Sequence, residues 1–257
     1  VHPGLLLILG AFALPWLRGG ARSVAVLALP LLALFCLWHL PEGARWQVAW
    51  LGYELAPLNV DKLSRLFATI FALMACGGGL FALRQASRLE IPAAYVYAGS
   101  AIGVALAGDL VTVFVFWELM AVGSTLVLWS AGTKAAWAAS RRYVMIHLLG
   151  GVVLFAGVTG HLLDAGDAAF VRMAPDSVAH WLILVGFLIN AGAPPLSAWL
   201  PDAYPEASWS GTVFLSAFTT KTAVYVLLRG FPGTEFLIWV GLFMVFYGIV
   251  YALLEND

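Results

Sequence analysis

The chain has 257 residues, of which 62% are hydrophobic and 11% charged, and its formal net charge is −1. Soluble domains carry about 25% charged residues, so this composition excludes a soluble globular protein and indicates a polytopic membrane protein. No basic run supports a nucleic-acid partner. Cys36 and Cys76 both lie inside apolar runs, which predicts buried thiols and neither a disulfide nor a metal pair.

Nine apolar runs set the predicted architecture. A helix that crosses roughly 30 Å of hydrocarbon needs about 20 residues. The sequence therefore predicts an all-α membrane bundle of about nine transmembrane helices. A Pro pair in the seventh run indicates that this helix is broken. The runs lie near residues 4–17, 23–40, 62–84, 91–108, 109–131, 141–163, 178–203, 209–231 and 235–254.

The longest loop covers residues 41–60. Within it Trp46, Val48 and Trp50 alternate with polar or small residues, which is the period of a β-strand. We expect a short hairpin or interfacial segment on the outer face, with the tryptophans near the lipid headgroups. An irregular loop with interfacial aromatic residues is the alternative.

Basic residues are distributed unequally between the two sets of loops. The positive-inside rule places the richer set in the cytoplasm, so the N-terminus is predicted to lie outside. The loops after the first, third and fifth runs carry Arg18, Arg22, Arg84, Arg88, Lys134, Arg141 and Arg142, whereas the other side carries Arg45, Lys62, Arg65, Arg172 and Arg229.

Glu118 is the first of several polar residues deep inside the apolar runs. It follows Asp109 by nine residues, which corresponds to about 13 Å of helix and places it near mid-membrane. A charged side chain at that depth costs at least a few kcal/mol, so it is a candidate functional residue. Glu118 is predicted to carry a proton; the alternative is a structural acid hydrogen-bonded to a neighbouring helix.

Lys221 lies near the middle of the eighth run, too deep for its amine to reach the interface easily. A buried lysine can exchange a proton, which predicts a role in proton transfer. The alternative, compatible with the first, is a counter-ion that holds Glu118 or a backbone carbonyl.

Asn190 stands next to the predicted helix break at Gly192, Pro194 and Pro195. Neither proline can donate a hydrogen bond to the carbonyl four residues earlier, so the carbonyls of Asn190 and Ala191 lose their donors. Such groups inside a membrane need protein or water as partners. A hydrated break is a possible ion path, although a kink that serves only packing is the alternative.

Two further residues complete the candidate path. His147 lies about seven residues into the sixth run, where it either relays protons or is a satisfied core residue. Asp202 and Glu206 follow the broken helix with no basic residue in their loop. They form an acidic lip that gathers cations; alternatively, Asp202 caps the following helix or holds the Pro-rich turn.

The segments FVFWELMAVGSTLVLW, FLINAGAPPLSAWLPDAYPEA and FTTKTAVYVLLRGF resemble the antiporter-like subunits shared by Mrp-type sodium/proton antiporters and respiratory complex I. The pattern WLPDAYPEA, with FTTK and YVLLR, looks most similar to the D subunit of Mrp antiporters. The resemblance implies N-terminal helices in residues 1–90, a first five-helix repeat in 91–231 and the start of a second repeat in 232–257. It also implies a bacterial inner membrane, other membrane subunits as partners, and no cofactor.

The same resemblance assigns roles to individual residues. The key glutamate of the family's fifth helix falls on Glu118, and the lysine of its eighth helix falls on Lys221. Two positions depart from the family pattern, because the lysine usual in the broken helix falls on Asn190 and the usual histidine falls on Ser197. The chain also looks like the N-terminal half of such a subunit.

Three functions follow as hypotheses. The first is a proton-translocating subunit, or part of one, of a multisubunit antiporter for monovalent cations such as Na⁺. The second is a proton-pumping membrane subunit of complex I or a related hydrogenase complex, with any redox centre on a partner. The third is a structural membrane subunit that does not conduct, which the loss of lysine at Asn190 favours. Under the first hypothesis the chain is not itself an enzyme.

Overall fold

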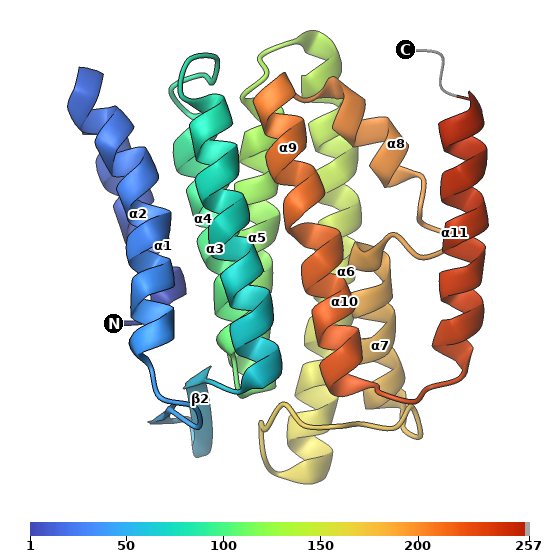
Figure 1. The fold of residues 1–257 in the computed structure, drawn as a ribbon. Helices are drawn as coiled ribbons and strands as arrows, with labels where there is room; N and C mark the ends of the chain where they lie inside the picture. Colours follow the sequence, from blue (N-terminus) through green and yellow to red (C-terminus); the bar gives the residue numbers. More distant parts are fainter. Residues whose placement is uncertain (255–257) are drawn as a thin grey trace.

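Helices account for most of residues 1–254, which are the residues that this computed structural model describes. The chain forms a mostly helical bundle in which the helices run side by side (Figure 1). The helical segments are α1 (Pro3–Ala13), η1 (Leu14–Trp16), α2 (Gly19–His39), α3 (Lys62–Ala82), α4 (Glu90–Leu106), α5 (Leu110–Trp129), α6 (Lys134–Ala165), α7 (Val178–Ala191), α8 (Trp199–Ala203), η2 (Tyr204–Glu206), α9 (Trp209–Ala217), α10 (Thr219–Gly230) and α11 (Phe236–Leu254).

Six stretches of helix within residues 1–254 are long and apolar enough to cross a membrane. Three further apolar helical stretches, 3–16, 90–106 and 178–191, are 10–17 residues long, which is shorter than the roughly 20 residues of a typical crossing. Each of the nine predicted runs therefore contains helix. The last three residues of the predicted 232–257 segment lie outside the described residues.

The helix α4 is the central element of the bundle. Every residue of α4 except Val96 is buried, and the helix packs against α1, α3, α5 and α10. Its small residues allow these close approaches. A Cβ at Gly99 would lie 2.6 Å from the Gly4 carbonyl of α1, which is closer than real Cβ contacts come, so the glycine is needed there. By contrast, none of the residues of α11, at the edge of the bundle, is buried (Figure 1).

The 41–60 loop forms the predicted hairpin. Strands β1 (Arg45–Trp50) and β2 (Tyr53–Asn59) pair antiparallel, with an irregularity between Trp46 and Val48. Asp109, the N-cap of α5, accepts hydrogen bonds from the amides of Thr112 and Ala56 at 2.7 and 2.8 Å. The carboxylate therefore caps a helix and at the same time ties β2 to the bundle.

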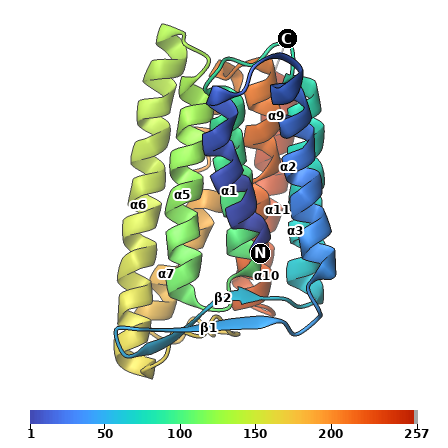
Figure 2. The same ribbon diagram turned by 90° about the vertical axis from the view of Figure 1, so that its left-hand side faces the viewer.

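The hairpin identifies one end of the molecule, which we call the hairpin end (Figure 2). The connections 107–109, 166–177 and 231–235 lie at the hairpin end, and the connections 17–18, 83–89 and 130–133 lie at the opposite end (Figures 1 and 2). The two sets of basic residues counted in the sequence therefore mark the two ends of the bundle.

The sequence predicted one continuous helix for the eighth apolar run, and the structure differs from this prediction. The run is divided at Phe218 into α9 and α10. The hydroxyl of Tyr97, from α4, accepts a hydrogen bond from the Thr219 amide at 2.8 Å and contacts the Thr219 hydroxyl. The Leu215 carbonyl at the end of α9 accepts a hydrogen bond from the Tyr204 hydroxyl at 2.8 Å. Side chains from other elements thus satisfy two of the backbone groups at the interruption, the Thr219 amide and the Leu215 carbonyl.

Candidate functional site

Glu118 lies on α5 where that helix faces α6. It is half-buried, and its Oε1 atom is buried without a hydrogen-bond partner among the described residues. The carboxylate sits against Gly151 of α6, where an added Cβ would come within 2.9 Å of Cδ and 3.1 Å of Oε2. The absence of a side chain at Gly151 therefore creates the space that the carboxylate occupies.

The neighbouring Gly150 leaves space for Asn190 in the same way. A Cβ on Gly150 would lie 3.1 Å from the Asn190 Oδ1 atom. Asn190 is fully buried, and neither its Oδ1 nor its Nδ2 has a hydrogen-bond partner in the part of the chain that the structure describes. Two consecutive glycines thus bring α6 close to a carboxylate from α5 and an amide from α7.

His147 precedes Gly150 by about one turn on α6 and is 1% exposed. Its ring lies between Tyr143 and Trp199, at centroid distances of 4.0 and 4.8 Å. Neither ring nitrogen has a hydrogen-bond partner within residues 1–254. We call Glu118, Asn190 and His147 the polar row, because all three gather along α6 inside an otherwise apolar bundle.

The end of α7 places Asn190 at this position. Gly192 adopts a left-handed conformation with φ +75°, and the amides of Gly192 and Ala193 bond back to Ile189 and Leu188 at 3.2 and 3.0 Å. This is a glycine-terminated helix end that satisfies two final carbonyls. The helix therefore stops at a glycine before it reaches Pro194 and Pro195, which lie in the connection 192–198.

Two side chains complete the surroundings of that connection. The indole Nε1 of Trp199 donates a hydrogen bond to the Ile189 carbonyl at 3.1 Å. Ser197 is 5% exposed and lies in the same connection. In the described residues, no backbone donor reaches the carbonyls of Asn190 or Ala191 from another element, which is the arrangement expected from the two prolines.

Lys221 does not have the buried environment that the sequence suggested. Its side chain is exposed on α10, and its Nζ donates a hydrogen bond to the Thr220 hydroxyl at 3.2 Å. It shares an outward face with Val224 and Leu228, whereas the face that includes Tyr225 packs inward. No ion pair joins Lys221 to Glu118 within residues 1–254, so the predicted counter-ion role has no support in the described fold.

The surroundings of Asp202 also differ from those that the sequence predicted. It forms a two-pronged ion pair with Arg142 of α6, with both contacts at 2.8 Å. The acid is therefore already neutralised by a basic residue 60 positions away, and it caps no helix. Sequence reasoning missed this pair because nothing local indicates that α8 returns to the start of α6.

A second titratable cluster at the hairpin end was also missed. The Nδ1 of His161 lies 3.1 Å from the Nε2 of His180, and the Nδ1 of His180 lies 2.9 Å from the Asp176 carboxylate. Each histidine lies near the end of an apolar run, and no local pattern links the two. The connection between α6 and α7 brings them together, although they are 19 positions apart.

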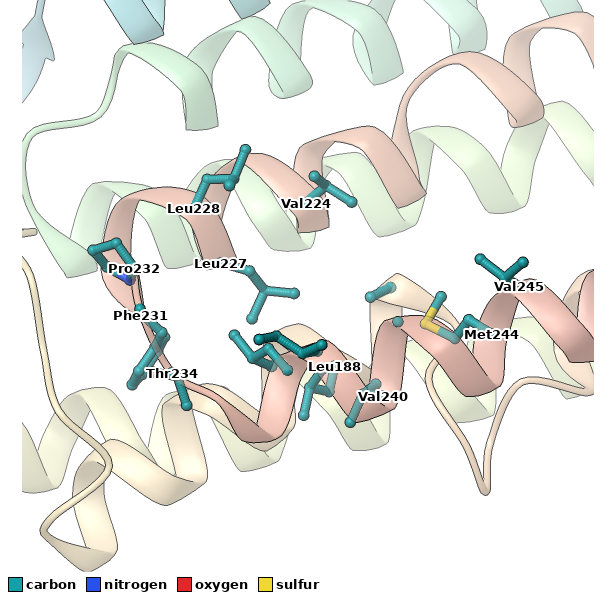
Figure 3. A pocket seen from close by; sticks show the side chains of 15 residues that line it. Leu188, Val224, Leu227, Leu228, Phe231, Pro232, Thr234, Val240, Met244 and Val245 are labelled. Atoms are coloured by element: carbon teal, nitrogen blue, oxygen red, sulfur yellow. The ribbon is translucent and has the colours of Figure 1, made fainter.

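A cavity at the side of the bundle is separate from these groups. It has a volume of about 660 Å³ and lies between α7, α10 and α11. Figure 3 shows that the residues labelled around the cavity are almost entirely apolar, with Leu188, Val224, Leu227 and Met244 among them. Because no member of the polar row lines this cavity, it offers no proton-carrying group of its own.

Known proteins resemble the chain over most of its length. Residues 107–257 match the family described as NADH:quinone oxidoreductase/Mrp antiporter, TM. The M subunit of NADH-quinone oxidoreductase from Escherichia coli (strain K12) is 29% identical over 94% of this chain and 52% of that protein. The D subunit of a Na(+)/H(+) antiporter from Alkalihalophilus pseudofirmus is 29% identical over 80% of this chain and 48% of that protein. The chain thus spans about half the length of these curated relatives.

Solved structures show the same fold at lower identity. A chain of respiratory complex I from Thermus thermophilus with bound Aureothin superposes with a TM-score of 0.80 at 22% identity, covering 99% of this chain and 59% of that one. A chain of the Mrp complex from Dietzia sp. DQ12-45-1b gives a TM-score of 0.74 at 24% identity, over 93% and 51%. Likeness at this level identifies the architecture alone.

Proposed function

Since the chain belongs to the NADH:quinone oxidoreductase/Mrp antiporter transmembrane family, we propose that it is a proton-translocating membrane subunit, or part of one, of a multisubunit monovalent cation/proton antiporter. One observation carries the proposal. A carboxylate in the middle of α5, Glu118, has a buried oxygen with no hydrogen-bond partner among the described residues. A buried acid that is not used for structure is expected to have a functional role.

In this proposal Glu118 holds the proton and the polar row conducts it. Gly151 gives the carboxylate its place, and Gly150 allows Asn190 to approach from α7. His147 continues the row along α6 and can both accept and donate a proton. Proton transfer needs groups within hydrogen-bond reach or one bridging water, and a row of unpartnered polar atoms suits such bridging.

Lys221 is the second exchanging group, on the outward face of α10. Its exposure in this chain means that the group with which it exchanges protons belongs to another membrane subunit or to another part of the same subunit. Ser197 and Asp202 line the route in the segment between α7 and α9, where Gly192, Pro194 and Pro195 interrupt the seventh helix. Na⁺ is the cation expected to be exchanged.

The remaining architectural predictions belong to the same proposal. The chain would cross the bacterial inner membrane nine times, with the N-terminus outside, and residues 91–231 would form the first five-helix repeat. The grouping of seven basic residues at the end opposite the hairpin supports this orientation. Residues 1–90 would precede the repeat, and 232–257 would begin a second one.

A second function has a specific observation in its favour. A relative named as a subunit of NADH-quinone oxidoreductase is as similar to this chain as the antiporter subunit is, at 29% identity in both cases. In a complex of that kind the same polar row would move protons, and a partner would supply the redox reaction. Adding Na⁺ to vesicles distinguishes an antiporter, and adding a reduced electron donor distinguishes a redox-driven pump.

The test is Glu118→Gln in the assembled complex, with proton movement measured by a pH-sensitive dye in inverted membrane vesicles. The amide has the same shape but cannot carry the proton, so the signal should be lost. Glu90→Gln is the matched control. Glu90 is 1% exposed, but its carboxylate accepts hydrogen bonds from Ser208, at 2.8 Å, and Ser210, so its role is structural and transport should persist.

Retained proton movement in Glu118→Gln would reject the assignment of this residue. Loss of transport in both variants, with both complexes assembled, would show that transport is sensitive to the replacement of either buried acid, and that Glu118 has no role distinct from that of Glu90. If the unmodified complex moves no protons with either energy source, the chain is a structural subunit.

A further inference from the structure

A cavity at the end opposite the hairpin gathers three arginines. It has a volume of about 350 Å³, and it lies where the turn between η1 and α2 meets the connection between α3 and α4. Arg18 lies in the turn between η1 and α2, Arg22 in the first turn of α2, and Arg88 in the connection between α3 and α4. Pro15, Leu17 and Gly19 complete the wall. The polar row is far along the chain and contributes nothing to this cavity.

The positive charge in this cavity is not balanced by the fold. In residues 1–254 none of the three arginines forms an ion pair with a carboxylate. The acid nearest to Arg88 in sequence, Glu90, is occupied by Ser208 and Ser210. The Nη2 atom of Arg22 is buried and has no hydrogen-bond partner in the described fold. Three like charges around a partly shielded space favour the binding of an anion.

The start of α2 adds a second set of donors. The helix begins at Gly19, and its N-cap residue, Arg18, makes no side-chain capping hydrogen bond. The first amides of a helix lack partners within the helix and carry the positive end of its dipole. Gly19 has φ +55°, and no other part of the described chain comes within 4 Å of where its Cβ would be, apart from its own neighbours in the helix. An anion can therefore approach the backbone amides and the guanidinium groups together.

The surroundings identify the source of the anion as a lipid. From this cavity, Trp16, Phe12 and Leu9 follow one another along η1 and α1 at spacings of four and three residues. Their exposed fractions are 78%, 58% and 68%. The row starts at Trp16, between the lining residues Pro15 and Leu17, so it offers an acyl chain an apolar track that begins beside the arginines, and tryptophan is a residue typical of the headgroup level.

The geometry points to a binding site for the phosphodiester headgroup of an anionic phospholipid, held by Arg22, Arg88 and the first amides of α2. Arg18 contributes charge from the rim. Guanidinium groups bind phosphate oxygens in pairs and retain their charge in a poorly hydrated place. Basic pockets between membrane helices bind lipid headgroups in this way.

The test uses the full chain purified in a mild zwitterionic detergent, with binding measured by calorimetric titration. The probes are short-chain phosphatidylglycerol, short-chain phosphatidylcholine and inorganic phosphate. We expect phosphatidylglycerol to bind at least about tenfold more tightly than the other two. Arg22→Gln and Arg88→Gln should each weaken phosphatidylglycerol binding by about tenfold or more, since each removes charge-assisted hydrogen bonds.

Arg84→Gln is the matched control, because Arg84 is an exposed arginine of the α3–α4 connection that does not line the cavity. It should change the affinity by less than about twofold, the scale of a screened surface charge. Arg88, which is exposed, provides a test even if the half-buried Arg22 cannot be replaced without loss of folding.

Equal weakening by Arg84→Gln would overturn the site in favour of general attraction to a basic surface. Equal affinity for inorganic phosphate would overturn the lipid as the source of the anion. Equal affinity for phosphatidylcholine would overturn the requirement for net negative charge.

Discussion

Gly151 offers the sharpest test of how Glu118 is held. In Gly151→Ala the new Cβ would lie 2.9 Å from Glu118 Cδ, and closer still to Oε1. Ordinary van der Waals contact begins at 3.4 Å, so Cδ must retreat by at least 0.5 Å (3.4 − 2.9), and Oε1 by more. The end of a glutamate side chain can move this far by rotating, so the fold should survive.

The neighbouring glycine provides the comparison. In Gly150→Ala the new Cβ would lie 3.1 Å from Asn190 Oδ1 and from Ile189 Cγ2, so a shift of about 0.3 Å (3.4 − 3.1) is enough. Both substitutions replace glycine by alanine in the interior of α6, and the intrinsic gain of about 1 kcal/mol in helix propensity is the same for both. The difference between the two variants therefore reports the contact with Glu118.

We expect Gly151→Ala to reduce the rate of proton movement by up to about 10²-fold, the effect of misplacing a reacting group by about 1 Å. Gly150→Ala should stay within a few-fold of the unmodified complex. The assay is the vesicle measurement with a pH-sensitive dye, together with thermal unfolding of the purified complex. The infrared band of the Glu118 carboxyl group, identified by its loss in Glu118→Gln, should shift only in Gly151→Ala.

Equal rates for Gly151→Ala and Gly150→Ala, with both complexes folded, would refute the reasoning that Gly151 positions a working carboxylate. A shifted infrared band with unchanged transport would show that the side chain moved and that its position is not critical.

Two further predictions concern stability. Burial favours the neutral form of Asp61, but hydrogen bonds from Arg229 and the Ser64 amide outweigh this effect and hold the pKa of Asp61 below its ordinary value. The 2.7 Å ion pair with Arg229 therefore stabilises the fold above about pH 4, and this stabilisation is lost as the pH falls through the lowered pKa. Asp61→Asn should reduce the free energy of unfolding by less than about 1 kcal/mol and remove this part of the acid dependence, and an unchanged profile of melting temperature against pH would contradict the bridge. Trp199→Phe keeps a ring 4.8 Å from His147 but removes the indole donor, while the Ile189 carbonyl keeps the Gly192 amide as a partner, so the free energy of unfolding measured with denaturant should fall by about 0.5–1.5 kcal/mol. Trp209→Phe, at a site that is 86% exposed, is its control, and equal losses in the two variants would argue against the hydrogen bond.

Much of the fold could be predicted from local sequence. The lengths of the apolar runs predicted helices in all nine places, because a backbone in lipid has to satisfy its own hydrogen bonds and a helix does so within one segment. The alternation of Trp46, Val48 and Trp50 suggested the hairpin that the structure contains. Depth within a run is also local information, since each residue adds a constant rise along a helix. For that reason Glu118 and Asn190 could be singled out before their neighbours were known.

What the sequence by itself determined was therefore which segments are helical and which polar residues lie deep within them. The tertiary structure decided which of those residues meet. It brought Glu118 and Asn190 to two consecutive glycines of α6, left Lys221 on an outward face and paired Asp202 with Arg142. It also divided the eighth run at Phe218, where Tyr97 supplies the missing backbone partner. The physical reason is that helix formation depends on neighbours within four residues, whereas these contacts depend on the rotation and approach of whole helices.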